Sequence, residues 1–488
     1  MIKDPKFEFG DFQTPLDAAR DVVACLRARG IDPESIVEPT CGIGSFLVAA
    51  TESFPHASKV YGFDINAEYV EQARSKVPSA SIDAKQFFDH NWTELIQSLP
   101  EPVLIIGNPP WVTSSGLSAR GANNLPEKTN FQGHRGLDAK TGKANFDIAE
   151  WILLRLMEAA GSRSVTIAML VKTAVARKVV QHAWRTEAPM RKASIHEIDA
   201  GHHFGVSVSA CLLVVELSAG RRTSTASVYT DLASKRADHK IGWESGQLIA
   251  DAEARENTRH LQLDADTKPK RRWRSGVKHD CSKVMEFRGQ PGRLVNGLGE
   301  EIDLEHEHVF PLMKGSDVAQ GREPSRWMLV PQRRTGDDTT RLREPSPKTW
   351  AYLEAHGEAL DRRGSSIYRK RPRFSIFGIG DYTFEPWKVA ICGLYKSLNF
   401  RVVGPFAGRP VVFDDTVYHL SFASEDEARH VADLLTSDLG SSFFRASIFW
   451  DNKRPVTAEV LNRLDVDALA EQMGVPIGEA EGSLTLFP

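Results

Sequence analysis

The tetrapeptide Asn108-Pro109-Pro110-Trp111 follows an apolar run and combines groups that can activate a weak nucleophile. An exocyclic amino nitrogen of a nucleobase is a poor nucleophile because its lone pair is delocalised into the ring. The Asn108 side-chain oxygen and the Pro109 carbonyl oxygen can accept hydrogen bonds from its two N–H groups and so localise that lone pair. The two prolines hold these acceptors in place beforehand, and the Trp111 ring can stack on a base. Taken alone, the pattern fits a rigid turn beside a buried tryptophan equally well.

A second candidate functional motif is the segment 37–46, a possible ligand-binding turn. It is predicted to end a strand, turn at Gly42 and Gly44, and open a helix. Glycines let a backbone approach a ligand where a Cβ atom would collide, and helix N-terminal amides can hold its polar end. Asp64 ends the next predicted strand, where a carboxylate can accept hydrogen bonds from ribose hydroxyls. The third glycine of the dinucleotide fingerprint is missing. The pattern therefore favours a nucleoside without a pyrophosphate, and S-adenosylmethionine fits.

The elements that must position these motifs alternate along the first two hundred or so residues. Strands are predicted at Ser35–Val37, Lys59–Phe63, Ser79–Ile82, Val103–Ile106, Val165–Val171, Ala193–Ile198 and Ser209–Leu217. Apolar residues at helical spacing predict helices at Leu16–Ala28, Ser45–Ser53, Ala67–Lys76, Phe146–Ala159 and Thr173–Trp184. This alternation predicts an α/β domain with a largely parallel sheet. No helix is predicted between the last two strands, so we expect an antiparallel hairpin at the sheet edge. Seven strands with that ending match the Rossmann-like class I S-adenosylmethionine-dependent methyltransferase fold.

The order of these motifs resembles the gamma-class (TaqI-like) N6-adenine DNA methyltransferases of type II restriction–modification systems. In that class a Phe-x-Thr-Pro motif precedes the glycine motif, as Phe12-Gln13-Thr14-Pro15 does here. The resemblance implies that S-adenosyl-L-methionine is the cofactor and that Asn108–Trp111 is the catalytic motif. It also implies that Trp111 and Phe204 stack on either side of a flipped-out adenine. The residues implied in cofactor binding are Thr14, Pro15, Glu38, Cys41, Gly42, Gly44, Asp64, Gln86 and Phe146.

Several alternatives stay open. Gln86 stands where the family often has an aspartate, and Phe146 and Phe204 also fit ordinary core packing. Trp111 is commoner in cytosine-N4 enzymes, whereas Asn108 favours adenine. A cytosine-N4 DNA methyltransferase is therefore the first alternative, and an RNA or protein methyltransferase with the same motif is a weaker one. A specificity protein with an inactive methyltransferase domain is the last, and the intact motifs argue against it.

The second half of the chain is expected to recognise DNA. A polar stretch at 218–227 suggests a boundary, with a catalytic domain at 1–235 and an α+β target-recognition domain at 236–488. Segments 311–318 and 382–390 resemble the recognition domains of the same class. Basic residues mixed with aromatics can bind phosphates and displaced bases, although a basic run is more often a solvated face. The predicted DNA-binding residues are Lys270, Arg271, Arg272 and Arg274, and Arg369, Lys370 and Arg371.

Composition sets wider limits. The 488 residues include 41% hydrophobic and 26% charged residues, typical of a globular protein of two large domains. Five scattered cysteines without a CxxC pair favour a reducing compartment and no metal site. No signal peptide and no apolar run of about 20 residues is present. We therefore expect a cytoplasmic, nucleoid-associated protein of a prokaryote or phage, without membrane contact. It should act as a monomer on double-stranded DNA, with any cognate restriction endonuclease on a separate chain.

Overall fold

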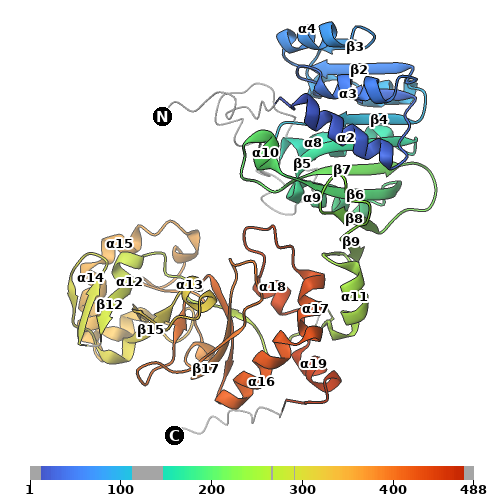
Figure 1. The fold of residues 1–488 in the computed structure, drawn as a ribbon. Helices are drawn as coiled ribbons and strands as arrows, with labels where there is room; N and C mark the ends of the chain where they lie inside the picture. Colours follow the sequence, from blue (N-terminus) through green and yellow to red (C-terminus); the bar gives the residue numbers. More distant parts are fainter. Residues whose placement is uncertain (1–12, 113–146, 265–266, 291, 478–488) are drawn as a thin grey trace. The chain divides into compact units, whose positions relative to one another are not determined.

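The computed structural model describes residues 13–112, 147–264, 267–290 and 292–477. It divides into two compact units, Met1–Glu253 and Ala254–Pro488, and each is described by itself. In Figure 1 the first unit is coloured from blue to green and the second from yellow-green to red. In these described ranges, no helix is long and apolar enough to cross a membrane.

The first unit is built on one 10-stranded sheet in the order β10-β9-β8-β6-β7-β5-β4-β1-β2-β3. Its strands are β1 (Ser35–Glu38), β2 (Lys59–Asp64), β3 (Ser81–Ala84), β4 (Val103–Gly107), β5 (Val165–Lys172), β6 (Met190–Ile198), β7 (Ala210–Leu217), β8 (Thr225–Tyr229), β9 (His239–Glu244) and β10 (Gln247–Ile249). Strands β1 to β5 pair in parallel, and β7 pairs antiparallel with both β5 and β6. The predicted α/β architecture and the antiparallel β6–β7 pair are confirmed.

Helices cover this sheet, as Figure 1 shows. They are α2 (Leu16–Ala28), α3 (Ser45–Ser53), α4 (Ala67–Lys76), α5 (Trp92–Ser98), α8 (Ile148–Ala160), α9 (Thr173–Arg185) and α10 (Ala200–Phe204), with the 3-10 turn η1 (Phe87–Asp89). Helix α11 (Ala252–Thr258) follows β10, and most of its residues belong to the second unit. The apolar sides of α2 and α3 meet β4 and β5 in one buried core, which includes Val22, Phe46, Leu104 and Leu170. This core holds the ends of the central strands in fixed positions.

Two sequence predictions for this unit need correction. The short helix α10 lies between β6 and β7, so the two strands are not a simple hairpin. They do not form the sheet edge either, because β8 pairs in parallel with β6 and leads on to β9 and β10. Strand β8 buries Ala226 and Val228 on one side and alternates them with polar residues. Such an alternation inside a Ser/Thr-rich stretch is a weak sequence signal.

The extra strands also affect the domain division. The structure divides after Glu253, whereas the sequence predicted a boundary after residue 235, which lies between β8 and β9. The sequence boundary followed a change of composition, and β9 and β10 come after that change but pair with the first sheet. The assignment of a catalytic and a recognition role to the two parts stays a prediction.

The second unit has the predicted α+β character, with a four-stranded sheet (β11-β20-β17-β18) and a six-stranded sheet (β14-β13-β12-β16-β15-β19). The strands are β11 (Arg274–Ser275), β12 (Glu286–Gln290), β13 (Arg293–Asn296), β14 (Glu301–Ile302), β15 (Val309–Met313), β16 (Arg326–Leu329), β17 (Trp387–Cys392), β18 (Arg401–Val403), β19 (Val412–Phe413) and β20 (Val417–Phe422). The helices are α12 (Ser282–Met285), α13 (Gly315–Ala319), α14 (Pro347–Ala355), α15 (Gly357–Asp361), α16 (Glu425–Thr436), α17 (Asp438–Ser447), α18 (Ala458–Leu461) and α19 (Val466–Gln472). Short 3-10 turns are η2 (Arg259–Leu261), η3 (His306–His308), η4 (Thr339–Arg343), η5 (Ser366–Tyr368) and η6 (Asp381–Thr383).

Candidate active site

The motifs singled out in the sequence meet at one edge of the first sheet. Strand β1 pairs in parallel with both β2 and β4, so the three carboxyl ends lie side by side. The glycine turn follows β1, Asp64 ends β2, and Asn108 follows β4. The carboxyl edge of a parallel sheet is the usual place for a ligand in this architecture. The sheet order alone therefore brings the two predicted motifs together.

The glycine turn has a tightly constrained backbone. Gly42 has φ +49° and Gly44 has φ +84°, both in the left-handed region that favours glycine. A Cβ atom on Gly42 would collide with the Gln13 side chain, and one on Gly44 would lie 2.9 Å from the Ala73 Cβ atom. The sequence prediction gave ligand approach as the reason for both glycines. The structure shows that close contact with the protein's own chain already requires them.

Gln13 is a contact that the sequence prediction missed. Its side-chain Oε1 accepts a hydrogen bond from the backbone N–H of Ile43 at 3.0 Å, which ties the start of the chain to the glycine turn. Gln13 occupies the variable position of the Phe-x-Thr-Pro motif, so the motif gave no reason to select it. Thr14 is buried beside it, and Pro15 is the N-cap residue of α2. Phe12 and Phe146 lie outside the described residues.

Asp64 is held rigidly at the end of β2. One carboxylate oxygen accepts from the Gly42 N–H at 2.8 Å, and the other accepts from the Asn66 N–H at 2.8 Å. Each carboxylate oxygen has two acceptor positions, so these bonds are compatible with a further hydroxyl donor. Gln86 is near this point in the sheet, because the neighbouring Lys85 N–H donates to the Asp64 carbonyl at 2.9 Å. These positions fit the predicted ribose site.

Two buried ionisable side chains, Glu38 and Cys41, come just before Gly42 in the chain. The Glu38 side chain is fully buried and accepts from the Leu47 N–H at 3.2 Å. Burial raises its pKa well above the usual range, and the nearby charge of Asp64 adds to the effect. Burial likewise raises the pKa of the Cys41 thiol. A thiol with a raised pKa stays protonated at neutral pH, so Cys41 acts as a packing residue rather than a nucleophile.

Asn108 has a buried side-chain acceptor without a partner in the described structure. Its side-chain Nδ2 donates to the Thr14 hydroxyl oxygen at 3.3 Å. Its Oδ1 is buried and has no hydrogen-bond partner among the described residues. Buried polar atoms are nearly always hydrogen-bonded, so an exception indicates a functional site. Pro109, next in the chain, is buried and Pro110 is half-buried. Asn108 Oδ1 can therefore accept a hydrogen bond from the N–H of an amino group.

Trp111 is anchored to β5 at two points. Its indole Nε1 donates to the Leu170 carbonyl at 3.0 Å, and its own carbonyl accepts from the Lys172 ammonium at 2.9 Å. Lys172 also forms an ion pair of 2.7 Å with the nearly buried carboxylate of Asp147. Asp147 in turn caps the N-terminus of α8. Lys172 and Asp147 were missed in the sequence because no short motif connects them with Trp111.

Phe204, at the end of α10, lies against Trp111. The two ring centroids are 5.5 Å apart and the planes meet at 68°, an edge-to-face contact. Both rings are partly buried against the same core. The structure thus brings together the two aromatic residues that the sequence paired. It also shows that they contact each other directly, so a base can enter between them only if the rings separate.

The predicted DNA-binding residues have different surroundings in the second unit. Lys270 and Arg272 are exposed, as are the three residues 369–371. The prediction for Arg271 needs correction, because its side chain is only 14% exposed and forms ion pairs with Glu427 and Asp467. It joins α16 and α19 and is not open to a phosphate. The neighbouring Trp273 is fully buried in a core cluster, and Arg274 lies over the Tyr382 ring at 5.0 Å.

Comparison with known proteins identifies the family of this chain. No family model matches the chain. The chain is 42% identical over 477 residues to the type II methyltransferase M.NspV of Nostoc sp., covering 96% of this chain and 98% of that protein. Among solved structures it is similar to the type IIL restriction–modification enzyme MmeI, solved in complex with DNA, with a TM-score of 0.50 and 13% identity. That match covers 92% of this chain, which spans 64% of the MmeI chain.

A weaker match is a class I S-adenosylmethionine-dependent methyltransferase from Listeria monocytogenes, with a TM-score of 0.34 and 12% identity. It covers 46% of this chain and 67% of that one. Strands β1 to β7 of the first unit have the order β6-β7-β5-β4-β1-β2-β3, and their antiparallel β6–β7 ending is the one predicted from the sequence for the class I S-adenosylmethionine-dependent methyltransferase fold. The first unit therefore has the class I S-adenosylmethionine-dependent methyltransferase fold, extended by three strands.

Proposed function

This chain belongs to the type II methyltransferases of restriction–modification systems, and we propose that it methylates N6 of a flipped-out adenine in duplex DNA. S-Adenosyl-L-methionine is its cofactor, as in the methyltransferases that it resembles. The observation that carries the adenine proposal is the buried, unpartnered Oδ1 of Asn108 beside Pro109.

The residues at the edge of the sheet fit this cofactor. The tight turn through Gly42 and Gly44 opens α3 and leaves no room for further side chains. Asp64 is fixed so that its carboxylate can accept from ribose hydroxyls. Thr14, whose hydroxyl oxygen accepts from Asn108 Nδ2, is a proposed contact of the methionine part. When bound, the cofactor supplies an activated methyl group, and the chain's own residues position the acceptor.

The chain's part in the reaction is to prepare the amino nitrogen. Asn108 Oδ1 and the Pro109 carbonyl accept hydrogen bonds from the two amino N–H groups, which favours a tetrahedral nitrogen with a localised lone pair. Their positions are set before the substrate binds, so little reorganisation is needed in the transition state. No general base is needed before attack, because the nitrogen uses its own lone pair and releases a proton to solvent afterwards. Burial of Oδ1 strengthens its interaction with the amino group.

A base inside a duplex cannot bring its amino group to this buried edge, so the target base must leave the helix. Trp111 and Phe204 are the proposed stacking partners, and Trp111 supplies the fixed side of the pair. Cytosine N4 is the second candidate substrate, because tryptophan at position 111 is commoner in cytosine-N4 enzymes. Asn108 favours adenine. RNA and protein substrates are less favoured, since 235 residues form a second unit that those substrates do not require.

Double-stranded DNA is the proposed partner of the second unit, through exposed cations such as Lys270, Arg272 and those at 369–371. Phosphate contacts from these residues would set the position of the enzyme on the duplex. We expect a monomer that acts in the cytoplasm beside the nucleoid, with a cognate endonuclease as a separate chain.

The test is identification of the product. Duplex DNA would be incubated with the enzyme and a cofactor that carries a labelled methyl group, and then digested to nucleosides. Chromatography separates N6-methyladenine from N4-methylcytosine, and the label is expected in N6-methyladenine. Label in N4-methylcytosine would establish the cytosine alternative. Label in structured RNA or in protein, but not in DNA, would overturn the proposal.

A further inference from the structure

Two cavities lie along the six-stranded sheet of the second unit. Arg326 and Trp327 are successive residues of β16, so their side chains leave opposite faces of the sheet. Trp327 lines a cavity of about 310 Å3, and Arg326 lines another of about 450 Å3. These cavities carry opposite charge, and that difference indicates which of the two can receive a polyanion.

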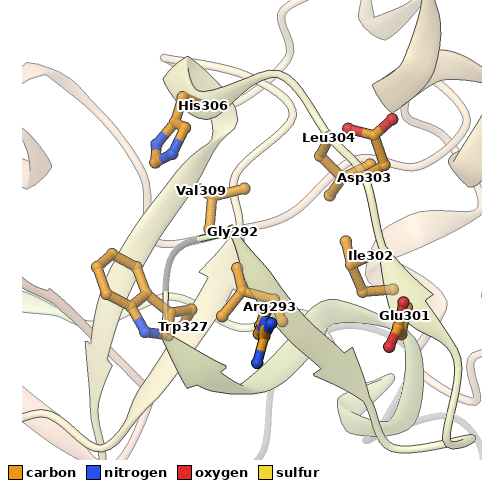
Figure 2. A pocket seen from close by; sticks show the side chains of 10 residues that line it. Gly292, Arg293, Glu301, Ile302, Asp303, Leu304, His306, Val309 and Trp327 are labelled. Carbon is orange, nitrogen blue, oxygen red and sulfur yellow. The ribbon is translucent and has the colours of Figure 1, made fainter.

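The cavity beside Trp327 is acidic. Figure 2 shows Asp303 and Glu301 on one side of it, and His306 and Trp327 on the other. Arg293 is its one permanently charged cation, against two carboxylates. A phosphate would be repelled more than attracted here.

The cavity beside Arg326 is basic. Four cations line it, namely Lys283, Arg288, Lys314 and Arg326, and Glu286 is its one carboxylate. The lining therefore carries an excess of three positive charges. A concave surface lined by one sign of charge concentrates its field and attracts counter-ions.

Glu286 organises half of these cations. Its buried carboxylate accepts from the Lys314 ammonium at 2.7 Å and from the Arg326 guanidinium at 3.4 Å, and His279 lies at 3.3 Å. Burial alone would raise the pKa of Glu286, but the hydrogen bonds from His279 and Lys314 outweigh it and lower the pKa to about 2. The carboxylate is thus ionised at neutral pH and fixes two of the four cationic side chains.

The other two cations are available. Lys283 and Arg288 are exposed, and the described structure gives neither an ion-pair partner. Each lies at the wall of a cavity in which the remaining cations are already held in place. An anionic group that enters meets two preset cations and two that can close on it. Arginine and lysine in such a setting form short, charge-assisted hydrogen bonds with phosphate oxygens.

We propose that this cavity binds a phosphate of the DNA backbone. Lys283 and Arg288 would contact the phosphate directly, and Lys314 and Arg326, held in place by Glu286, would add positive charge to the cavity. The proposal rests on the proposed function and goes beyond it, because it selects one cavity and four residues, none of which was among the DNA-binding residues predicted from the sequence.

Salt dependence of binding tests the proposal, because each phosphate contact contributes about 0.9 to the slope of log K against log salt. Dissociation constants for a duplex that the enzyme methylates would be measured from about 50 to 200 mM salt. The variant Lys283→Ala/Arg288→Ala is expected to have a slope shallower by about two contacts. Arg293→Ala, which removes an exposed arginine from the acidic cavity, is the matched control and should keep the wild-type slope. Melting curves would verify that both variants are folded.

An unchanged slope in Lys283→Ala/Arg288→Ala, with wild-type methylation of DNA retained, would overturn the phosphate site alone. A weaker affinity with an unchanged slope and an altered base preference would assign the cavity to base contact and also overturn it. If the wild-type enzyme bound its cofactor but neither bound nor methylated duplex DNA, the proposed function itself would fall. The wild-type measurement therefore separates the two failures.

Discussion

Asn108 and Thr14, 94 residues apart in the chain, are joined by a hydrogen bond of 3.3 Å from the amide Nδ2 to the hydroxyl Oγ1. This bond fixes the direction of the amide and leaves Oδ1 as a buried acceptor without a partner in the described structure. Leaving a buried acceptor unsatisfied lowers the free energy of unfolding by about 1–3 kcal/mol. A ligand that donates a hydrogen bond to this acceptor removes the cost. The Phe-x-Thr-Pro segment thus orients the amide for which we propose the catalytic role.

Replacing Asn108 with alanine should reduce kcat at least about a hundredfold, the scale for loss of one preorganised polar group in a transition state. Cofactor affinity should stay close to wild type, because Asn108 acts on the base. Single-turnover transfer of a labelled methyl group to duplex DNA would measure the effect. Thr14→Val keeps the Asn108 oxygen but removes its orienting bond, so a loss of up to about tenfold is expected. Wild-type transfer by Asn108→Ala would make the tetrapeptide a structural turn.

Asp64→Ala should weaken S-adenosylmethionine binding by about 1–3 kcal/mol, the range for charge-assisted hydrogen bonds. Calorimetric titration would give the dissociation constant. Because Asp64 also accepts from the Gly42 and Asn66 amides, some loss of thermal stability should accompany the change. Asp64→Asn, which retains one oxygen acceptor, serves as the intermediate control. Equal affinity in all three proteins would remove the ribose assignment.

Lys172→Met should lower both stability and turnover. The substitution leaves the Asp147 carboxylate, whose side chain is 9% exposed, without its ion-pair partner. Loss of the partner of a nearly buried charge costs about 2 kcal/mol or more. The Trp111 carbonyl loses its donor at the same time. In the double variant Lys172→Met/Asp147→Asn, melting temperature should recover while methyl transfer stays slow. Recovery of both would mean that Lys172 has no part in positioning Trp111.

The helices around the site were predictable from sequence because local signals define them. The observed bounds of α2, α3 and α4 equal the predicted Leu16–Ala28, Ser45–Ser53 and Ala67–Lys76. In α4, the side chain of Asn66 accepts from the Glu68 N–H and so caps the first turn, a signal visible in the sequence. Strand bounds were predicted less closely, since β3 is Ser81–Ala84 instead of Ser79–Ile82 and β6 begins at Met190 instead of Ala193.

What could not be predicted depends on pairing through space. Strand β8 belongs to the sheet because β6 leaves it an open edge, which its own residues do not show. Lys172 is 61 residues from Trp111, and Arg271 is 196 residues from Asp467. The sequence around a lysine or arginine does not tell whether its side chain forms an ion pair with a buried carboxylate or is exposed to solvent. The motif marked Asn108, but only the fold shows that its oxygen lacks a partner.

The stability of the first unit should fall as pH decreases below neutrality because of His196. Burial and the charge of Arg29 lower the pKa of its imidazole to about 4, and the ring contacts Ser194 and stacks on Tyr229. Below its usual pKa of about 6.5, the unfolded chain binds a proton that the folded protein excludes. The contribution is therefore complete above about pH 6.5 and is lost as pH falls toward 4. In His196→Phe, the melting temperature should fall less over this range, and an equal fall in both proteins would contradict the assignment.

Binding of the target base should separate Phe204 from Trp111, whose ring centroids are 5.5 Å apart without DNA. Trp111 is tied to β5 through its Nε1 and its carbonyl. Phe204 ends the five-residue helix α10, followed by Gly205 with φ +67°, so Phe204 is the side expected to move. A 2-aminopurine at the target position should brighten when it leaves the stack, although stacking on the indole reduces the gain. Affinity for target DNA is the sharper readout.

Phe204→Ala should weaken binding of target DNA by about 1–3 kcal/mol, the energy of stacking one base on an aromatic ring. Phe204→Tyr keeps a ring at this position and is the matched control, with affinity and turnover near wild type. Because the Phe204 ring also packs against the core, melting curves must show that the alanine variant is folded at the temperature of the assay. A folded Phe204→Ala protein that bound and methylated DNA like wild type would restrict Phe204 to core packing. The base would then stack on Trp111 alone.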